Sequence, residues 1–179
     1  MGLYYDISKD LDFLSYKFGI NKVTALLFNR GIHALIVYRL ANRSASLNIP
    51  LIPLILTRIV QILYSIDISW KCKIEGGIII IHGVGLVIGE GTVIEKGCIL
   101  YHGVTLGRKY QISEKHPNDG FPSIRANCVL GAGAKLIGNI QIGENTIVSP
   151  NVVLFKSVGK GVIVKNVEPV IITKNNKKK

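Results

Sequence analysis

The segment GLVIGEGTVIEKGCILYHGVTLG, residues 85–107, has an aliphatic residue at every sixth position. These aliphatic residues are Ile88, Ile94, Leu100 and Leu106. A period of six fits neither the turn of an α-helix, about 3.6 residues, nor the alternation of about two residues in a half-buried strand. It is typical instead of repeated short strands that are separated by turns, as in a solenoid.

The same spacing continues in both directions, after a slip of two residues upstream and after an interruption downstream. The aliphatic positions outside the central segment are Ile68, Ile74, Ile80, Ile124, Leu130, Leu136, Ile142, Val148 and Leu154. Small or β-branched residues lie four places after most of the aliphatic positions: Thr92, Cys98, Val104, Cys128, Ala134, Thr146 and Val152. We therefore predict a mainly β fold, a triangular parallel β-helix with one inward aliphatic residue per side. The glycines directly after inward positions suit tight corners: Gly89, Gly107, Gly131 and Gly143.

The pattern of the chain changes near Asp67, and this change predicts its organisation. Residues 1–66 are expected to form a small α-helical N-terminal region, because apolar residues recur at helical spacing between Gly31 and Arg43 and again over Pro50–Ile66. Residues 67–173 are expected to form the β-helix. Within it, residues 108–123 read as a loop excursion, and a loop of this length is usually functional or disordered. Residues 174–179 form a basic tail.

Charge and composition limit the partners. The chain has 22 Lys and Arg against 11 Asp and Glu, a net charge of +11, which favours a nucleotide-bearing cofactor, an acidic polymer or a membrane surface. Aromatic residues make up only 7% of the chain, and no stacking motif is present, so no nucleic-acid partner is expected. The apolar run Ile49–Ile66 contains Pro50, Pro53 and Arg58. It predicts a buried or interfacial helix rather than a transmembrane one, and it leaves peripheral membrane contact open.

The cysteines indicate the compartment. Cys72, Cys98 and Cys128 are odd in number and form no C-x-x-C pair, which argues against a disulfide framework and fits a reducing environment. Residues 1–17 show no basic-then-apolar signal peptide. We expect a cytoplasmic protein, with association with the inner face of the membrane left open.

Two blocks resemble a known family: DISWKCKIEGGIIIIHGVGLVIGEGTVIEKGCILYHGVTLG, from residue 67, and IRANCVLGAGAKLIGNIQIG, from residue 124. They look like the serine acetyltransferase group of left-handed β-helix acyltransferases, and the resemblance runs from about Gly31 to Pro169. It implies a left-handed β-helix, acetyl-CoA as the acyl donor, no metal, and a homotrimer with sites shared between subunits.

The resemblance also implies roles for single residues. His82 matches the catalytic general base, and Asp67 matches the aspartate that pairs with it. A separation of fifteen residues is close to one coil of about eighteen residues, so the two residues should lie on adjacent coils. The block from Gly131 to Asn139 matches the region that binds the donor. The expected contacts to acetyl-CoA are Gly107, Gly131, Ala132, Gly133, Ala134, Lys135 and, in the tail, Lys174.

The acceptor side departs from the serine enzymes. Ile81 stands where they have an aspartate before the histidine, His102 replaces a glutamine, and Gly120 and Phe121 precede Pro122 where they have Arg-His. His116 comes into register only through an insertion in the loop. Ile81, His102 and His116 are therefore the acceptor-binding candidates. The departures resemble the acetyltransferases of surface-polysaccharide gene clusters, and they predict O-acetylation of a saccharide hydroxyl. The alternative is a serine O-acetyltransferase of cysteine biosynthesis.

Other interpretations remain open at this point. His82 could be a structural histidine in a coil, Asp67 could cap the first coil, and the whole chain could be a scaffold without activity. A zinc site would need three convergent histidines, and the spacing of His82, His102 and His116 does not support one. The cysteines fall at or near repeat positions, so a cysteine nucleophile is not expected.

Overall fold

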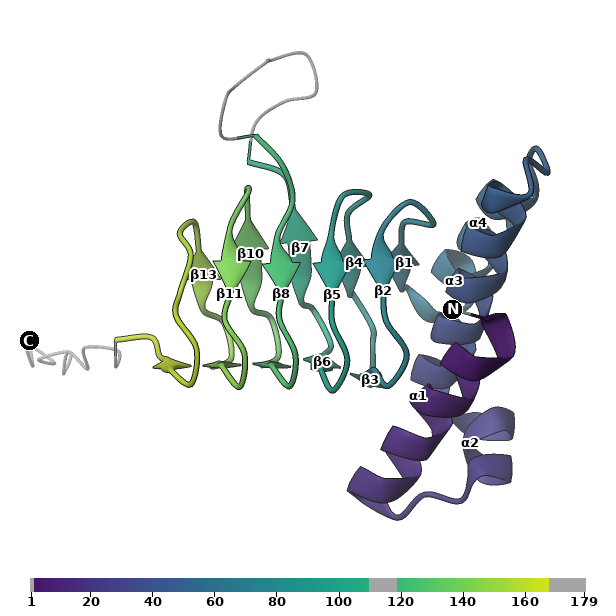
Figure 1. Ribbon diagram of the computed structural model, residues 1–179, viewed down its shortest axis with the longest axis horizontal. Coiled ribbons are helices and arrows are strands. Elements are labelled where there is room, and N and C mark those ends of the chain that lie inside the picture. The colour runs from purple at the N-terminus through teal and green to yellow at the C-terminus, as the bar shows by residue number, and fades with distance from the viewer. Residues whose placement is uncertain (1, 110–118, 168–179) are drawn as a thin grey trace, which may run out of the picture.

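The computed structural model describes residues 2–109 and 119–167. Helices come first in the chain and pack against one end of a solenoid of short strands, whose last strands lie at the opposite end (Figure 1). The helices are α1 (Leu3–Phe18), α2 (Lys22–Phe28), α3 (Arg30–Ser46) and α4 (Ile52–Tyr64). The prediction of a parallel β-helix behind a helical region is confirmed, and α4 ends just before the first strand begins at Asp67.

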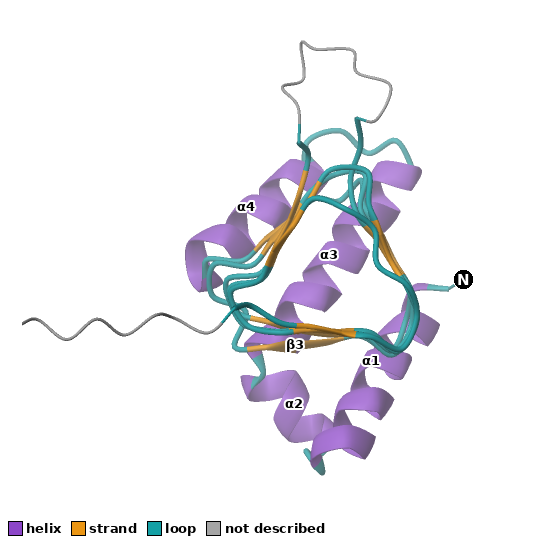
Figure 2. Cartoon of the chain, turned by 90° about the vertical axis from the view of Figure 1, so that its left-hand side faces the viewer, coloured by secondary structure: helices purple, strands orange, loops and turns teal. Residues whose placement is uncertain are grey.

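The strands form three parallel sheets, which are the sides of the triangle seen end-on in Figure 2. Side A contains β1 (Asp67–Ile68), β4 (Val87–Ile88), β7 (Thr105–Gly107), β10 (Lys135–Ile137) and β13 (Val153–Leu154). Side B contains β2 (Lys73–Ile74), β5 (Val93–Ile94), β8 (Ser123–Ile124) and β11 (Gln141–Ile142). Side C contains β3 (Ile79–Ile81), β6 (Ile99–Tyr101), β9 (Val129–Leu130), β12 (Ile147–Val148) and β14 (Ile163–Val164).

The core is the column of inward aliphatic side chains that the spacing predicts. All thirteen of these residues are buried, and the most exposed of them, Ile74 and Leu154, are 8% accessible. They pair in register between coils, as where Ile88 lies against Leu106 and Leu106 against Leu136. The small and β-branched residues four places further on are buried too. Each coil therefore completes the core of its neighbours.

The glycines after inward positions have a different reason from the one we expected. Gly89, Gly131 and Gly143 do not have positive φ angles. A Cβ atom on Gly131 would lie 2.7 Å from the Pro150 nitrogen, and one on Gly143 would lie 2.5 Å from the Gly159 carbonyl carbon. Close approach of the next coil therefore requires these glycines. The positive φ angles at the corners fall on other residues, such as Asn127.

A buried ion pair fastens the helices to the first coil. Asp10 of α1 accepts hydrogen bonds from Arg39 of α3 and from the backbone N–H groups of Gly77 and Ile78. Arg39 also donates to the carbonyl oxygen of Glu75. Both charged side chains are almost fully buried, at 2% and 4% exposure. The helical region and the solenoid are therefore joined by charged hydrogen bonds as well as by apolar contact.

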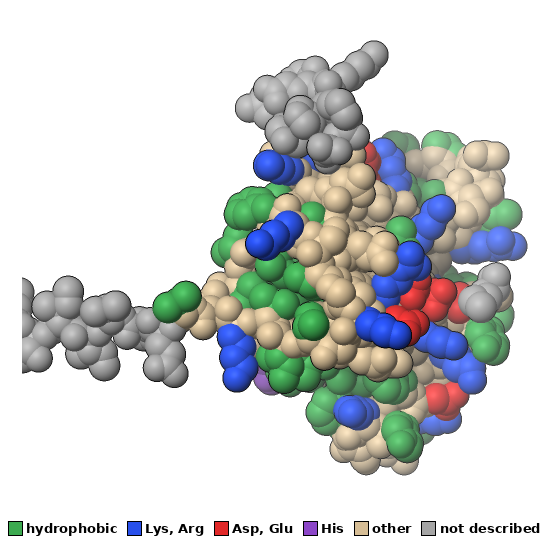
Figure 3. All heavy atoms as spheres, turned by 60° about the vertical axis from the view of Figure 1, so that its left-hand side comes forward, with side chains coloured by type: hydrophobic (Ala, Val, Ile, Leu, Met, Phe, Trp, Pro, Cys, Tyr) green, Lys and Arg blue, Asp and Glu red, His purple; other side chains and the backbone are tan. Residues whose placement is uncertain are grey.

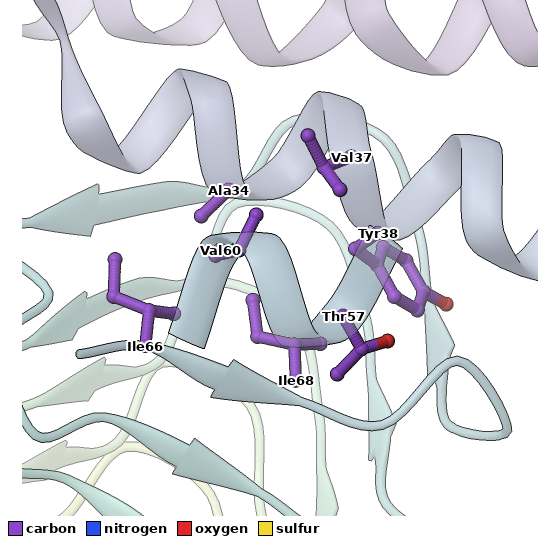
Figure 4. Close-up of a pocket in the computed structure, with 7 residues that line it drawn as sticks. All are labelled: Ala34, Val37, Tyr38, Thr57, Val60, Ile66 and Ile68. Atoms are coloured by element: carbon purple, nitrogen blue, oxygen red, sulfur yellow. The ribbon is translucent and has the colours of Figure 1, made fainter. Parts of the chain in front are cut away.

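Apolar contact between α3, α4 and β1 completes the junction. Figure 4 shows Val37 and Tyr38 of α3 facing Val60 of α4, with Ile66 and Ile68 beside them. The space between these side chains is only about 10 Å³, which is at the lower limit of what a buried water needs. The run that includes α4 is thus partly packed, as expected for a buried or interfacial helix. In the described part of the chain, no helix combines the length and the apolar character needed to cross a bilayer.

The Asp10–Arg39 pair gives a stability prediction. Asp10→Ala removes the carboxylate that is hydrogen-bonded to the buried Arg39 guanidinium and leaves only Asp6, at 3.9 Å, as its charged partner, so it should lower the free energy of unfolding by about 3 kcal/mol. Urea denaturation measures this. Asp12→Ala is the matched control, because Asp12 lies in the same helix in an exposed ion pair with Lys22 and should leave the free energy nearly unchanged. Equal losses in both variants would contradict the role of the buried pair.

Candidate active site

The predicted site residues meet at one corner of the triangle, where side C turns into side A. This corner contains His82 on the first coil, His102 on the second, and Ala132 and Gly133 on the third. Backbone hydrogen bonds stack these turns directly: Gly103 N–H donates to the Val84 carbonyl, and Gly133 N–H donates to the His102 carbonyl. The four residues therefore form a continuous strip along the solenoid, which we call the corner strip.

The two-residue slip in the repeat falls at His82. Because Gly103 bonds to Val84 and Val87 bonds to Val104, residues 84–86 match residues 102–104, and the two surplus residues are His82 and Gly83. They form a tight turn in which Gly83 N–H donates to the Ile81 carbonyl at 2.7 Å. His82 has φ 62° there, a strained value for a residue with a side chain. The insertion therefore makes an exposed imidazole protrude from the corner.

His102 lies beside that imidazole. The centroids of the His82 and His102 rings are 5.9 Å apart, with the rings edge to face. Both side chains are exposed. The regular repeat does not predict that these two histidines are neighbours. They are twenty residues apart in the sequence, two residues more than the length of a regular coil. The slip brings them together on successive coils.

The predicted donor contacts lie beyond His102. Gly107 and Lys135 are on side A, where β7 and β10 pair, and the Lys135 ammonium lies 3.5 Å from the Gly103 carbonyl oxygen. Ala134 is fully buried in the core, so only its backbone could contact a donor. Gly131 is buried under the next coil. Lys174 and His116 lie outside the described residues.

Asp67 has a partner other than the one we expected. Its carboxylate accepts a hydrogen bond from the Gln61 side chain of α4 at 3.5 Å. Among residues 2–109 and 119–167, none of the hydrogen bonds joins Asp67 to His82. Asp67 is nevertheless at the start of β1, and its N–H donates to the Leu86 carbonyl, just after the turn that contains His82. The pairing of the two side chains stays a prediction.

Two departures on the acceptor side have structural explanations. Ile81 packs against the apolar cluster between α1, α3 and side C, so its apolar character serves the helical junction. Phe121 covers two glycines of the second coil, since Cβ atoms on Gly89 and Gly91 would come within 2.3 and 2.5 Å of its ring. Neither residue indicates a particular acceptor.

All three cysteines are enclosed in the core, away from a bound substrate. Cys72, Cys98 and Cys128 are free and buried. Burial raises the pKa of the Cys72 thiol to about 12, and the thiolate is the reactive form. In the described residues, no three metal-ligating side chains cluster.

Several surface hollows lie away from the corner strip. One of about 710 Å³ lies between α1 and the corner joining sides B and C, and it contains none of the predicted residues. A second, about 270 Å³, lies near β10 between Lys109 and Lys156. Figure 3 shows Lys and Arg side chains spread over the face toward the C-terminal end of the solenoid.

A third hollow, between α4 and β1, contains Asp67. The sequence did not lead us to predict this hollow. The one feature that pointed to it was Arg58, a charged residue within an apolar run.

Comparison with known proteins decides the family. The chain matches the family model for bacterial transferase hexapeptide (six repeats) over residues 121–156. It is 35% identical to a serine acetyltransferase of Helicobacter pylori over 155 residues, which is 87% of this chain and 88% of that protein. The chain belongs to the serine acetyltransferase family. It is also 34% identical to the serine acetyltransferase of Synechococcus elongatus over 77% of this chain and 55% of that protein.

Solved structures of the family agree with this assignment. A serine acetyltransferase in complex with cysteine matches with a TM-score of 0.85 at 28% identity, over 96% of this chain and 70% of that one. Another, from Brucella abortus in complex with coenzyme A, matches with a TM-score of 0.83 at 28% identity, over 92% of this chain and 65% of that one. The chain spans 55% and 57% of two curated relatives that it matches.

The predicted saccharide acceptor is therefore wrong. The curated relatives and the solved structures are serine acetyltransferases, which supports the alternative interpretation. The error came from treating Ile81 and the segment before Pro122 as marks of the acceptor, although Ile81 and Phe121 are fixed by packing.

The backbone strain at His82 gives a stability prediction. His82→Gly should keep or raise the free energy of unfolding, because relief of strain of about 1–3 kcal/mol outweighs the entropy cost of glycine, about 0.5–1 kcal/mol. His102→Gly is the matched control, since His102 does not have a positive φ and should be destabilised. Chemical denaturation compares them. Equal destabilisation would show that the turn at His82 is unstrained.

Proposed function

We propose that the protein transfers the acetyl group of acetyl-CoA to the hydroxyl of L-serine. The observation that carries this proposal is the strained, exposed His82, held on an inserted turn beside His102 at the head of the corner strip. Strain in a folded protein persists where the surroundings impose it, and it gathers at functional sites. The relatives that the chain matches are named serine acetyltransferases, which supports serine as the proposed acceptor.

The proposed chemistry is direct transfer. His82 takes the proton of the serine hydroxyl as the oxygen attacks the thioester carbonyl carbon. The new C–O bond forms, the C–S bond breaks, and the proton held by His82 passes to the departing sulfur. Asp67, as a neighbouring carboxylate, would stabilise the protonated imidazole. Backbone N–H groups of the corner would stabilise the negative charge on the carbonyl oxygen.

Acetyl-CoA would lie along the corner strip. Ala132 and Gly133 have little or no side chain and are partly exposed, so an extended pantetheine chain can approach their backbone. Lys135 projects from side A next to this strip and offers a cation for phosphate. The related structure with coenzyme A bound supports the choice of donor.

The proposed assembly is a homotrimer that acts in the cytoplasm. The exposed corner with His82 and His102 would then face a neighbouring subunit, which could close the site against water. The hexapeptide-repeat family match supports a trimer.

The role of His82 predicts a loss of turnover. His82→Asn should lower kcat for serine acetylation about 10²- to 10⁴-fold, because asparagine tolerates a positive φ but cannot accept the proton. Release of coenzyme A thiol measures the rate. The fold should be kept, as judged by thermal unfolding. Wild-type turnover in this variant would overturn His82 as the base, and no turnover of serine by the wild type would overturn the function.

The donor assignment predicts a selective change in KM. Lys135→Gln should raise KM for acetyl-CoA about 10- to 100-fold through loss of a charged hydrogen bond worth about 1.5–3 kcal/mol, and leave KM for serine unchanged. Lys160→Gln, an exposed lysine in the turn before β14, is the control. If Lys135→Gln behaves like Lys160→Gln, Lys135 does not bind the donor.

A further inference from the structure

The side of α4 that faces away from the core is apolar. The buried residues of this helix are Pro53 and Val60, and a surface helix normally carries polar residues on the side opposite to its buried one. Figure 1 shows α4 at the end of the molecule away from the later coils. The large apolar side chains that α4 exposes, by between 40% and 74%, include Ile52, Ile55, Ile59, Ile62 and Leu63. We call these five residues the outer face of α4.

The short helix α2 continues this apolar surface. His33 of α3 joins the two helices, because its Nδ1 lies 2.9 Å from the Tyr64 hydroxyl oxygen of α4 and its Nε2 lies 2.7 Å from the Leu26 carbonyl oxygen of α2. The ends of α2 and α4 therefore flank a single residue of α3. The apolar side chains that α2 exposes are Val23, Leu26, Leu27 and Phe28. Apolar surface that is exposed on neighbouring elements marks an interaction site.

Cations without acidic neighbours accompany the apolar surface. None of the eleven Asp and Glu residues of the chain lies within residues 13–66. The Lys and Arg residues of this stretch are Lys17, Lys22, Arg30, Arg39, Arg43 and Arg58. Arg58 comes three residues after Ile55 and four before Ile62, so it lies beside both on the helix surface. It is exposed and donates to the neutral side chain of Gln61. In the part of the chain that the structure describes, Arg58 takes part in none of the ion pairs.

This combination fits a lipid surface better than a second copy of the chain. Two copies of the outer face would bring Arg58 toward cations of the same stretch, and neither copy offers a carboxylate there to pair with them. An anionic bilayer supplies phosphate groups for the cations and hydrocarbon for the apolar side chains. With 13 residues, α4 is shorter than the roughly 20 residues that a spanning helix needs. It can therefore lie only in the plane of the surface.

We propose that the outer face of α4, together with the exposed side of α2, docks the protein on an anionic lipid bilayer. The apolar side chains enter the boundary between headgroups and acyl chains, to a depth of about 5–10 Å. Arg58 lays its aliphatic stem along this apolar surface and keeps its guanidinium among the phosphates. No residue of the corner strip takes part, so the docking does not depend on the proposed function.

Flotation of the whole protein with lipid vesicles tests the apolar contact. The wild type should float with vesicles of equal parts phosphatidylcholine and phosphatidylglycerol. The double variant Ile55→Asn, Ile62→Asn should lower the partition coefficient about 10- to 100-fold. Its matched control is Val153→Asn, Ile163→Asn, which removes two apolar side chains exposed on the solenoid and should partition like the wild type. Equal partition of the two double variants, or no flotation of the wild type, overturns the docking.

The charge contribution has its own variant. Arg58→Gln should lower partition into the mixed vesicles about five-fold, the effect of one cation near an anionic surface. Binding of the wild type should weaken at about 1 M salt, where charges are screened beyond about 3 Å, and on vesicles of phosphatidylcholine alone. Lys160→Gln, on the solenoid, is the control and should bind like the wild type. An equal loss in Lys160→Gln would show that the net charge of +11 binds the vesicles without this face, and it overturns the proposal.

A fluorescent label gives the orientation of the bound protein. The three native cysteines are buried, so an environment-sensitive dye can be attached at Ile62→Cys alone. The mixed vesicles should shift its emission to the blue, and the same dye at Ile163→Cys should be unaffected. Equal shifts at the two positions overturn the orientation. A blue shift at position 62 that appears without lipid as the protein concentration rises would mean that a second copy covers the face, and it overturns the docking.

The failure of this proposal is distinct from the failure of the proposed function, because none of these measurements uses turnover. A protein that binds vesicles through Ile55 and Ile62 but does not acetylate serine supports the docking and overturns the function. A protein that acetylates serine and does not bind the mixed vesicles supports the function and overturns the docking.

Discussion

The structure depends on one packing constraint: each coil buries its aliphatic side chains only against the coil above and below. Leu106 lies between Ile88 and Leu136 in register, and a shift by one residue would turn the inward set outward. Because the sides are held in register, the corners are stacked in register too. A corner is therefore the place where side chains from distant segments align, and the corner strip is the consequence.

The same constraint explains which surplus residues the fold tolerates. Residues added within a side would break the column, whereas residues added at a corner protrude. His82 and Gly83 are such an addition. The addition makes room for the exposed His82 side chain, which has no place in the regular coil. The ion pair between Asp10 of α1 and Arg39 of α3 then fixes these helices against the first coil.

The sequence predicts the core well because the aliphatic residue at every sixth position is the one that points inward, and every inward position is buried. It predicts the glycines that follow the inward positions, but for the wrong reason. These positions require glycine because the neighbouring coil approaches closely, and not because the backbone has a positive φ. It finds His82 and His102 separately, but their contact depends on the two-residue slip. It misreads Ile81, because the helices that cover that residue are distant in sequence.

The central claim is that the corner strip is the place of acyl transfer. The chain has four histidines, so an imidazole NMR spectrum can be followed residue by residue as coenzyme A and L-serine are added. The account predicts that the His82 and His102 resonances shift, while that of His33, which is bound between Tyr64 and the Leu26 carbonyl, stays in place. Unshifted His82 and His102 signals at saturating ligand would contradict it.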